Sequence, residues 1–153
     1  MPSLTKRNSN NSEQEFHVLG SPRFDQQWIT KLDFLVPEHK FPNDSKPKLK
    51  ILWLLAKTKY PITDTQKALC LIKKISDISC VQLVVKPHPR DVIPNFSETI
   101  NMTVVGPKTS SSALIKWADL VLFTHTSAVL EALVRDKPIG YLKYLITSPA
   151  LHE

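Results

Sequence analysis

The stretch best suited to chemistry is the polar cluster THTS at Thr124–Ser127. It follows the apolar run Leu120–Phe123 and precedes an amphipathic segment that ends near Arg135, which predicts a strand, a polar turn and a helix. Thr126 or Ser127 would then lie at the first turn of the helix, where unpaired N–H groups and the helix dipole favour an anion. Ser and Thr are also common helix caps, and this stretch taken alone favours the cap.

A second cluster, KPHPR, follows the apolar run Val81–Val85. Its two prolines end the strand and hold His88 in a rigid turn, which aims an imidazole with little entropy left to lose. Lys86 and Arg90 place a cation on each side of it. The alternatives are that His88 hydrogen-bonds a neighbouring loop and that the two cations are solvated.

The elements that position these clusters alternate along the chain from Leu49 onward. Apolar runs predict strands at Leu49–Ala56, Val81–Val85, Met102–Val105, Leu120–Phe123 and Pro138–Leu142. Helical periodicity and capping residues predict helices from Thr63 or Asp64 to Ile78, from about Ser110 to Ala118, and from Ser127 to Arg135. The alternation predicts an α/β fold, a Rossmann-like parallel sheet of about five strands with helices on both faces. The strand at Leu49 should be central, between those at Val81 and Leu120.

Loops that follow parallel strands share one edge of the sheet, so their polar residues should converge there. These residues are Lys57, Thr58 and Lys59, then Lys86, His88 and Arg90, then Gly106, and finally Thr124, His125, Thr126 and Ser127. Cations, an imidazole, hydroxyls and a helix start in one crevice suit a phosphate or diphosphate. Glu131 is one helical turn after Ser127 and could face the same ligand or be a surface charge near the helix start. His125 could point into the crevice or pack under the sheet.

Composition divides the chain into three parts. The first residues are rich in Ser, Asn and Gln and cannot bury enough apolar surface to order themselves. A short strand at His17–Leu19 and a helix at Asp25–Leu35 are expected next, before a charged, proline-rich linker. We therefore predict a disordered N-terminus at 1–15, a segment leading into the main unit with its linker at 16–48, and the α/β domain at 49–153. The tail lacks closing helices, so we expect that domain to be truncated.

Charge and composition exclude several classes of protein. The net charge is +6, and residues 49–153 carry thirteen Lys or Arg against eight Asp or Glu. The basic residues are spread singly, which does not favour a nucleic-acid partner. A small anionic ligand, an anionic membrane face met from the cytosol, or a merely solvated basic surface would each account for the excess. The three glycines are too few for a phosphate-binding P-loop or a dinucleotide fingerprint.

The two cysteines, Cys70 and Cys80, have no partner at metal-ligand spacing, so neither a zinc site nor a disulfide framework is expected. We also find no signal peptide and no apolar run free of charges that could span a membrane. A cytoplasmic location is therefore predicted. A location at the inner face of the membrane is the second form of this prediction.

The two clusters together resemble the C-terminal, nucleotide-binding half of GT-B glycosyltransferases. The likeness covers about residues 49–145, and it is greatest to the bacterial group of CDP-glycerol glycerophosphotransferases, capsule-polysaccharide transferases and polysialyltransferases. That group has a His-Pro pair after one strand, and a pair of hydroxyl residues with an acidic residue four positions after the second. The matching positions here are His88-Pro89, Thr126, Ser127 and Glu131.

The resemblance implies that His88, Thr126 and Ser127 hold donor phosphates and that Glu131 faces the nucleotide sugar. Gly20–Trp28 is similar, more weakly, to the segment that enters this half from the acceptor domain. The sequence departs from the group at Thr124, which is often acidic there, and at Asp136, which is usually glycine. No acceptor domain is recognised in the chain.

The function implied is that of a donor-binding domain in bacterial surface-polysaccharide synthesis. It would bind a nucleotide-diphosphate or nucleotide-monophosphate donor carrying a sugar or polyol phosphate, with no metal or other cofactor. An acceptor domain or subunit would be needed for turnover, so the isolated chain should be inactive. The alternatives are a non-catalytic nucleotide-binding module and a relative of the sugar-nucleotide epimerases, although the acidic cleft residues that an epimerase needs are not found.

Overall fold

The computed structural model describes residues 17, 20–41, 48–57, 63–91 and 99–147. Several predictions fall outside these residues. They are the N-terminal disorder, most of the expected strand at His17–Leu19, the middle of the linker, Thr58, Lys59 and the last six residues.

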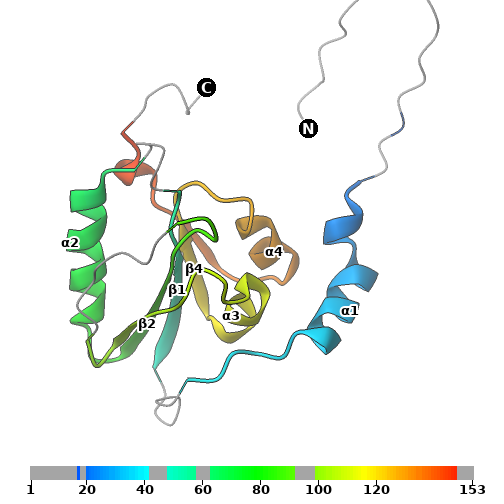
Figure 1. The fold of residues 1–153 in the computed structure, drawn as a ribbon, viewed down its shortest axis with the longest axis horizontal. Helices are drawn as coiled ribbons and strands as arrows, with labels where there is room; N and C mark the ends of the chain where they lie inside the picture. Colours follow the sequence, from blue (N-terminus) through cyan, green and yellow to red (C-terminus); the bar gives the residue numbers. More distant parts are fainter. Residues whose placement is uncertain (1–16, 18–19, 42–47, 58–62, 92–98, 148–153) are drawn as a thin grey trace, which may run out of the picture.

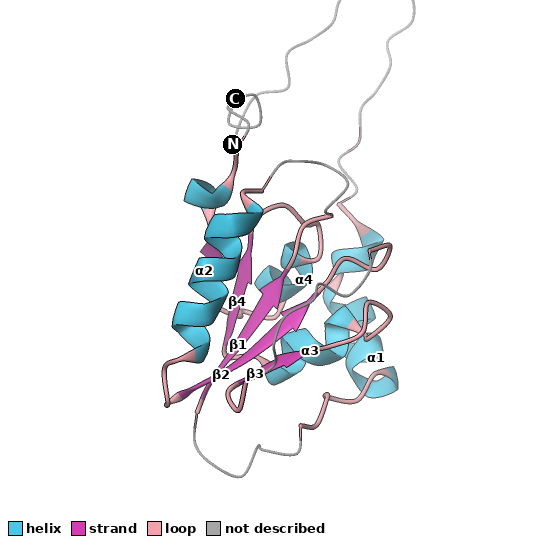
Figure 2. Cartoon of the chain, turned by 60° about the vertical axis from the view of Figure 1, so that its left-hand side comes forward, coloured by secondary structure: helices cyan, strands magenta, loops and turns pink. Residues whose placement is uncertain are grey.

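A five-stranded parallel sheet forms the centre of the molecule (Figure 2). Its strands are β1 (Leu49–Leu54), β2 (Val81–Lys86), β3 (Met102–Val104), β4 (Leu120–Phe123) and β5 (Ile139–Tyr141). The order β3-β2-β1-β4-β5 confirms the predicted Rossmann-like fold, including the central place of β1. In the register, Leu54 pairs with both Lys86 and Phe123, so β1, β2 and β4 end at the same level and deliver their loops to one place.

Helices cover both faces of the sheet (Figure 1). They are α2 (Thr65–Ser76) on one face, and α3 (Ser111–Trp117) and α4 (Val129–Val134) on the other, with η2 (Lys143–Leu145) beside α2. Side chains alternate along the buried strand β1, as the pleat of a strand requires. Ile51 and Trp53 join the core under α2, whereas Leu52 and Leu54 join the core under α3 and α4.

The predicted starts of two helices are confirmed by their caps. The carboxylate of Asp64 accepts a hydrogen bond from Lys67 N at 3.0 Å at the start of α2. The hydroxyl of Ser110 accepts one from Ala113 N at 3.3 Å at the start of α3. Each bond satisfies an N–H that has no partner inside its helix.

The helix predicted from Ser127 to Arg135 is shorter than expected. It begins at Val129, and its N-cap Ala128 has no side-chain cap. The Thr126 hydroxyl accepts a hydrogen bond from Ala128 N at 3.3 Å, a local bond that competes with helical pairing of the backbone. The prediction that Thr126 or Ser127 lies at the first turn of the helix is therefore wrong, because both residues precede the N-cap Ala128.

Helix α4 ends in a left-handed residue, Asp136, with φ of 52°. Asp136 N donates to Leu133 O, and Lys137 N donates to Ala132 O, both at 3.0 Å. This pair of bonds is the Schellman arrangement, in which glycine is the usual left-handed residue. An aspartate adopts this backbone conformation at a cost in free energy, whereas glycine adopts it freely. The resembling group usually has glycine at this position, and the left-handed backbone of Asp136 fits that preference.

The segment before the sheet packs against the domain rather than lying apart from it. It contains η1 (Pro22–Phe24) and α1 (Gln26–Leu35), which lies outside α3 and α4 in Figure 1. The segment predicted as a linker also contributes to the core, because Phe41 is buried with its ring centroid 4.9 Å from that of Trp117. An aromatic ring at Phe41 thus anchors the chain just before the residues that lead into β1.

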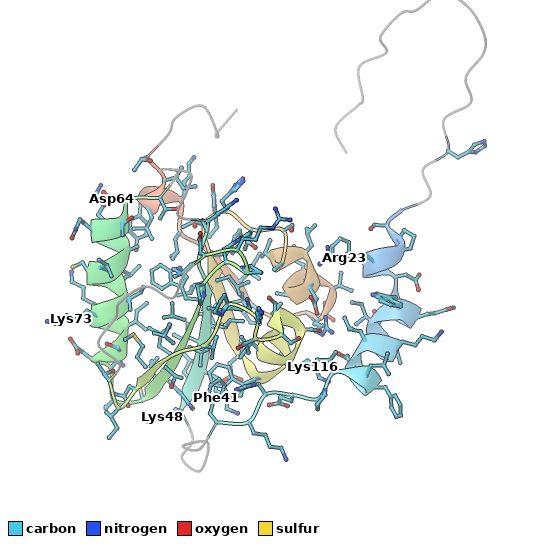
Figure 3. The ribbon with its side chains drawn as sticks, in the orientation of Figure 1. Arg23, Phe41, Lys48, Asp64, Lys73 and Lys116 are labelled. Carbon is cyan, nitrogen blue, oxygen red and sulfur yellow. The ribbon has the colours of Figure 1, made fainter. Side chains whose placement is uncertain are left out.

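Three charged residues hold α1 in place, and we call them the α1 seam: Asp33, Lys116 and Arg135. Lys116 Nζ donates to Asp33 O at 2.9 Å and to Val36 O at 3.0 Å, at the carboxyl end of α1, where the helix dipole favours a cation. Arg135 Nη2 donates to Asp33 Oδ1 at 2.7 Å and to Ser112 Oγ at 3.1 Å. Figure 3 shows Lys116 between α3 and α1.

Candidate functional site

The strand ends enclose a small cavity of ≈ 200 Å³, which we call the inner cavity. It lies between the end of β2 with the loop that follows it, the loop before α4 with the first turn of α4, and η1. Six of its polar lining residues come from these elements, namely Arg23, Lys86, His88, Thr126, Ser127 and Glu131. The structure therefore brings together five of the six site residues predicted from the sequence. Arg90, the sixth, is exposed and does not line this cavity.

A wider hollow of ≈ 890 Å³ adjoins the inner cavity and shares His88, Thr126 and Ser127 with it; we call it the outer cavity. His125 lines it and is exposed, which settles the question left open by the sequence. Its wall includes Tyr141, whose ring stacks on Phe123 with centroids 5.3 Å apart. The two cavities together form a polar recess that continues into a broader, partly aromatic one.

A hollow of ≈ 690 Å³ beside η1 and α1 is larger than the inner cavity. It is lined only by residues between Gly20 and Lys31, so it gathers side chains from a single segment. Sites in α/β folds gather residues from several loops at the carboxyl edge of the sheet. The inner and outer cavities have that property, and the hollow on α1 does not.

The imidazole of His88 is held by its own loop. Arg90 N donates to His88 Nδ1 at 3.2 Å, and Asp91 N donates to His88 O at 2.9 Å. Because Nδ1 accepts this hydrogen bond, the neutral ring carries its proton on Nε2. His88 therefore presents a fixed N–H donor at the junction of the two cavities. Arg90 contributes to the site through its backbone N–H.

Lys86 is the last residue of β2 and is only 2% exposed. Its ammonium donates to Pro87 O at 3.3 Å and to Pro107 O at 3.1 Å, which ties the loops after β2 and β3 together. The alternative of a solvated Lys86 is therefore wrong, because the strand runs one residue further than expected and carries the side chain inward. Burial lowers the pKa of Lys86 below its ordinary value of 10.5. An ammonium has three donors, and these two bonds leave one for a ligand.

The two hydroxyls before α4 differ in their bonding. The Thr126 hydroxyl oxygen accepts from Ala128 N, which leaves its hydrogen able to donate. Ser127 is exposed, and its hydroxyl makes no hydrogen bond with any residue that the structure describes. Both hydroxyls line both cavities, so they can reach a ligand in either.

Glu131 has an internal partner. Its side chain is 11% exposed, and its Oε1 atom lies 2.8 Å from Nη1 of Arg135, whose side chain is 6% exposed. This contact is an ion pair without hydrogen-bond geometry, because neither Glu131 Oε1 nor Arg135 Nη1 forms a hydrogen bond. Glu131 therefore lines the inner cavity as one half of an ion pair, and the guanidinium of Arg135 compensates part of its negative charge.

Arg23 is the site residue that sequence reasoning missed. It belongs to η1, and Figure 3 shows it between that element and α4. The one signal for it was the weak likeness of Gly20–Trp28 to a segment that enters a nucleotide-binding domain. With Arg23 included, the inner cavity has two cationic side chains, one fixed imidazole N–H and two hydroxyls, a set that favours an anion.

Two further findings concern the residues that the structure describes. Among them, no group of three His, Cys, Asp or Glu side chains is placed to hold a metal ion. None of the helices in the same part of the chain has the length and apolar character needed to cross a bilayer.

Comparison with known proteins finds likenesses among solved structures. No protein family matches the chain, and no curated protein matches it. Among solved structures, Thermosulfurimonas dismutans KpsC, a beta Kdo 2,4 transferase, is similar, with a TM-score of 0.47 and 11% sequence identity. The likeness covers 78% of this chain and 44% of that chain, so the chain spans less than half of the length of that protein.

Proposed function

We propose that the chain is the donor-nucleotide-binding domain of a glycosyltransferase or polyol-phosphate transferase of GT-B type. The inner cavity would bind the phosphates of a nucleotide-activated donor. One observation carries the proposal: Lys86, His88 and the hydroxyls of Thr126 and Ser127 reach one cavity of ≈ 200 Å³ from separate loops of the sheet. Such convergence at the carboxyl edge is how open α/β sheets bind ligands.

The chemistry that the residues supply is stabilisation of a leaving phosphate. Negative charge grows on that group as its bond to the transferred sugar or polyol breaks, and donors fixed beforehand stabilise it without reorganising. His88 Nε2 and the free donor of Lys86 are fixed in this way by their bonds to backbone groups. The outer cavity would take the rest of the nucleotide, where the exposed ring of Tyr141 offers a surface for a base.

Turnover requires more than this cavity. A transferase must also hold the acceptor hydroxyl in line and accept its proton. We propose that an acceptor domain or subunit does both, so that the chain on its own binds the donor but does not transfer it. The proposal includes a cytoplasmic location. The proposal also includes contact with an anionic membrane face, because Lys and Arg outnumber Asp and Glu in the chain. No nucleic-acid partner is proposed.

The second candidate is a nucleotide-binding module with no catalytic role. Thr124, which stands where the resembling group often has an acidic residue, is buried, and its hydroxyl lies 3.4 Å from that of Thr63. An acid–base role at that position is thus lost, which favours binding without catalysis. Transfer assays with and without an added acceptor subunit would separate the two candidates.

Calorimetric titration with CDP, CMP, UDP and GDP tests the proposal. His88→Ala should weaken binding by about 1.5–3 kcal/mol if the imidazole donates to a charged phosphate. His39→Ala is the matched control, because His39 packs on Phe41 with ring centroids 4.4 Å apart and lines neither cavity. The proposal is wrong if none of these nucleotides binds at millimolar concentration, or if both variants bind as the parent does.

A further inference from the structure

The inference concerns η1 and α1, and it rests on the proposed function. Arg23 is placed by a well-defined local structure rather than by a loose chain. Asp25, two residues later, accepts a hydrogen bond from Gln27 N at 2.8 Å and so caps α1. Ile29, on the next turn of α1, is buried at 3% exposure. The position of Arg23 is therefore determined by the docking of α1 on the domain.

The α1 seam connects that docking to the inner cavity. Arg135 binds Asp33 of α1 at 2.7 Å through Nη2 and pairs with Glu131 at 2.8 Å through Nη1. Glu131 lines the inner cavity, together with Arg23. The buried guanidinium of Arg135 therefore contacts both α1, the helix that positions Arg23, and Glu131 in the wall of the inner cavity.

No counter-ion for Arg23 is found in the part of the chain that the structure describes. Its guanidinium lies 5.7 Å from the ring centroid of Phe24 and forms no ion pair with any residue that the structure describes. Arg23 is exposed and lines the same small cavity as Lys86, so an anion bound there would be attracted by both cations. A guanidinium presents a planar fork of donors that matches two oxygens of a phosphate.

We infer that Arg23 is a phosphate-binding residue of the inner cavity, and that donor binding and the docking of α1 stabilise each other. An anion held by both Arg23 and the loops after β2 and β4 bridges the η1–α1 segment to the sheet. By linkage, docking of α1 must then raise the affinity for the anion by the same factor by which the anion favours docking. The segment before the sheet is thereby part of the ligand site.

The experiment compares three variants with the parent by calorimetric titration with CDP and with inorganic pyrophosphate. Arg23→Ala should weaken binding of both about tenfold or more, as expected for loss of a charge-assisted hydrogen bond. Arg23→Lys should recover part of this loss, because the charge remains without the fork. Lys31→Ala is the matched control, since it removes one exposed positive charge from the same segment outside the inner cavity and should change affinity less than about twofold.

Hydrogen exchange of the α1 amides in the parent and in Arg23→Ala provides a readout that a purely structural role would not give. CDP should slow exchange in α1 of the parent and have little effect on α1 of Arg23→Ala. Asp33→Ala, which removes the seam contact and leaves the cavity side chains in place, should speed exchange in α1 and weaken CDP binding.

The two proposals fail differently. If CDP binds and His88→Ala weakens it, but Arg23→Ala binds like Lys31→Ala, the inference is overturned and the proposed function stands. Unchanged exchange in α1 of the parent on addition of CDP would overturn the coupling in the same way. If the parent binds neither CDP nor pyrophosphate, the proposed function and the inference are both overturned.

Discussion

Two regions of the molecule concentrate positive charge, and they use it differently. In the seam, each cation has protein partners: Lys116 binds two carbonyls of α1, and Arg135 binds Asp33 and pairs with Glu131. Next to it, Lys137 Nζ donates to Lys116 O at 3.0 Å and to Ala118 O at 2.7 Å, at the carboxyl end of α3. In the inner cavity, Lys86 bonds two carbonyls and keeps one donor, Arg23 has no ion pair with the described residues, and His88 bonds those residues through Nδ1 and its backbone while its Nε2–H stays available.

The difference separates charges that hold the fold together from charges available to a ligand. A buried cation with protein partners costs much to disturb, because removing it strands the groups it satisfies. An exposed cation without a protein partner, such as Arg23, leaves no group stranded when it is removed, and its donors are available to an anion. Substitutions in the first region should therefore change stability, and substitutions in the second should change affinity.

Arg135→Ala should give the largest change in stability. It removes the bonds to Asp33 and Ser112 and leaves the buried carboxylate of Glu131 without a counter-charge. Loss of one partner of a buried ion pair costs about 3–5 kcal/mol of unfolding free energy, measured by urea denaturation. Lys67→Ala, which breaks the exposed pair with Asp64, is the control and should cost less than about 1 kcal/mol. Equal losses of unfolding free energy for the two variants would show that the buried ion pairs of the seam stabilise the fold no more than an exposed pair does.

Raising the pH should stabilise the parent relative to Lys86→Met. Burial lowers the pKa of Lys86 in the folded state, so between that lowered value and 10.5 the unfolded chain binds more protons than the folded one. The unfolding free energy contributed by Lys86 therefore rises with pH through this window and is constant below it. Urea denaturation of both proteins from neutral pH to pH 10 measures the difference, and a constant difference would contradict the buried, charged ammonium.

Asp136→Gly should stabilise the protein by about 1 kcal/mol. Asp136 has φ of 52°, a conformation that costs an L-residue with a side chain and that glycine adopts freely. The added freedom of glycine in the unfolded chain offsets part of the gain. Because this residue lies in neither the inner nor the outer cavity, affinity for CDP should not change. Thermal unfolding followed by calorimetric titration tests both statements, and a loss of stability would contradict the Schellman geometry.

Arg90→Ala should have the smallest effect. The side chain of Arg90 is exposed and lines neither cavity, while the backbone N–H that holds His88 remains in the variant. Affinity for CDP should therefore change less than about twofold. A tenfold loss would show that the loop after β2 moves Arg90 onto the ligand, and would restore the role first predicted for it.

The sheet could be predicted from the sequence because its signals are local. Unbroken apolar runs such as Leu52–Leu54 belong to strands buried on both faces, and Asp64 and Ser110 stand where caps are required. The convergence of His88 with Ser127 also follows from topology, because parallel strands deliver their loops to one edge. The strand order and that convergence therefore needed no knowledge of side-chain packing.

The parts that could not be predicted depend on contacts between distant residues. Arg23 lines the inner cavity from a segment that is held by contacts such as the bond between Asp33 and Arg135, which are 102 positions apart. The burial of Lys86 depends on Pro107 O, which lies on another loop. The start of α4 was misplaced because a hydroxyl at Thr126 can bond the backbone in a turn as well as in a cap, and the sequence pattern is the same for both.

The central claim, that the inner cavity binds phosphate through His88, is tested most directly by nitrogen-15 NMR of the imidazole rings. Spectra would be recorded with and without millimolar CDP, UDP or GDP. His88 should show its proton on Nε2 in the free protein, and its Nε2 signal should shift on addition of at least one nucleotide, while the signals of His39 stay in place. If the signals of His88 remain unchanged, as those of His39 do, with all three nucleotides, the phosphate site assigned to the inner cavity is contradicted.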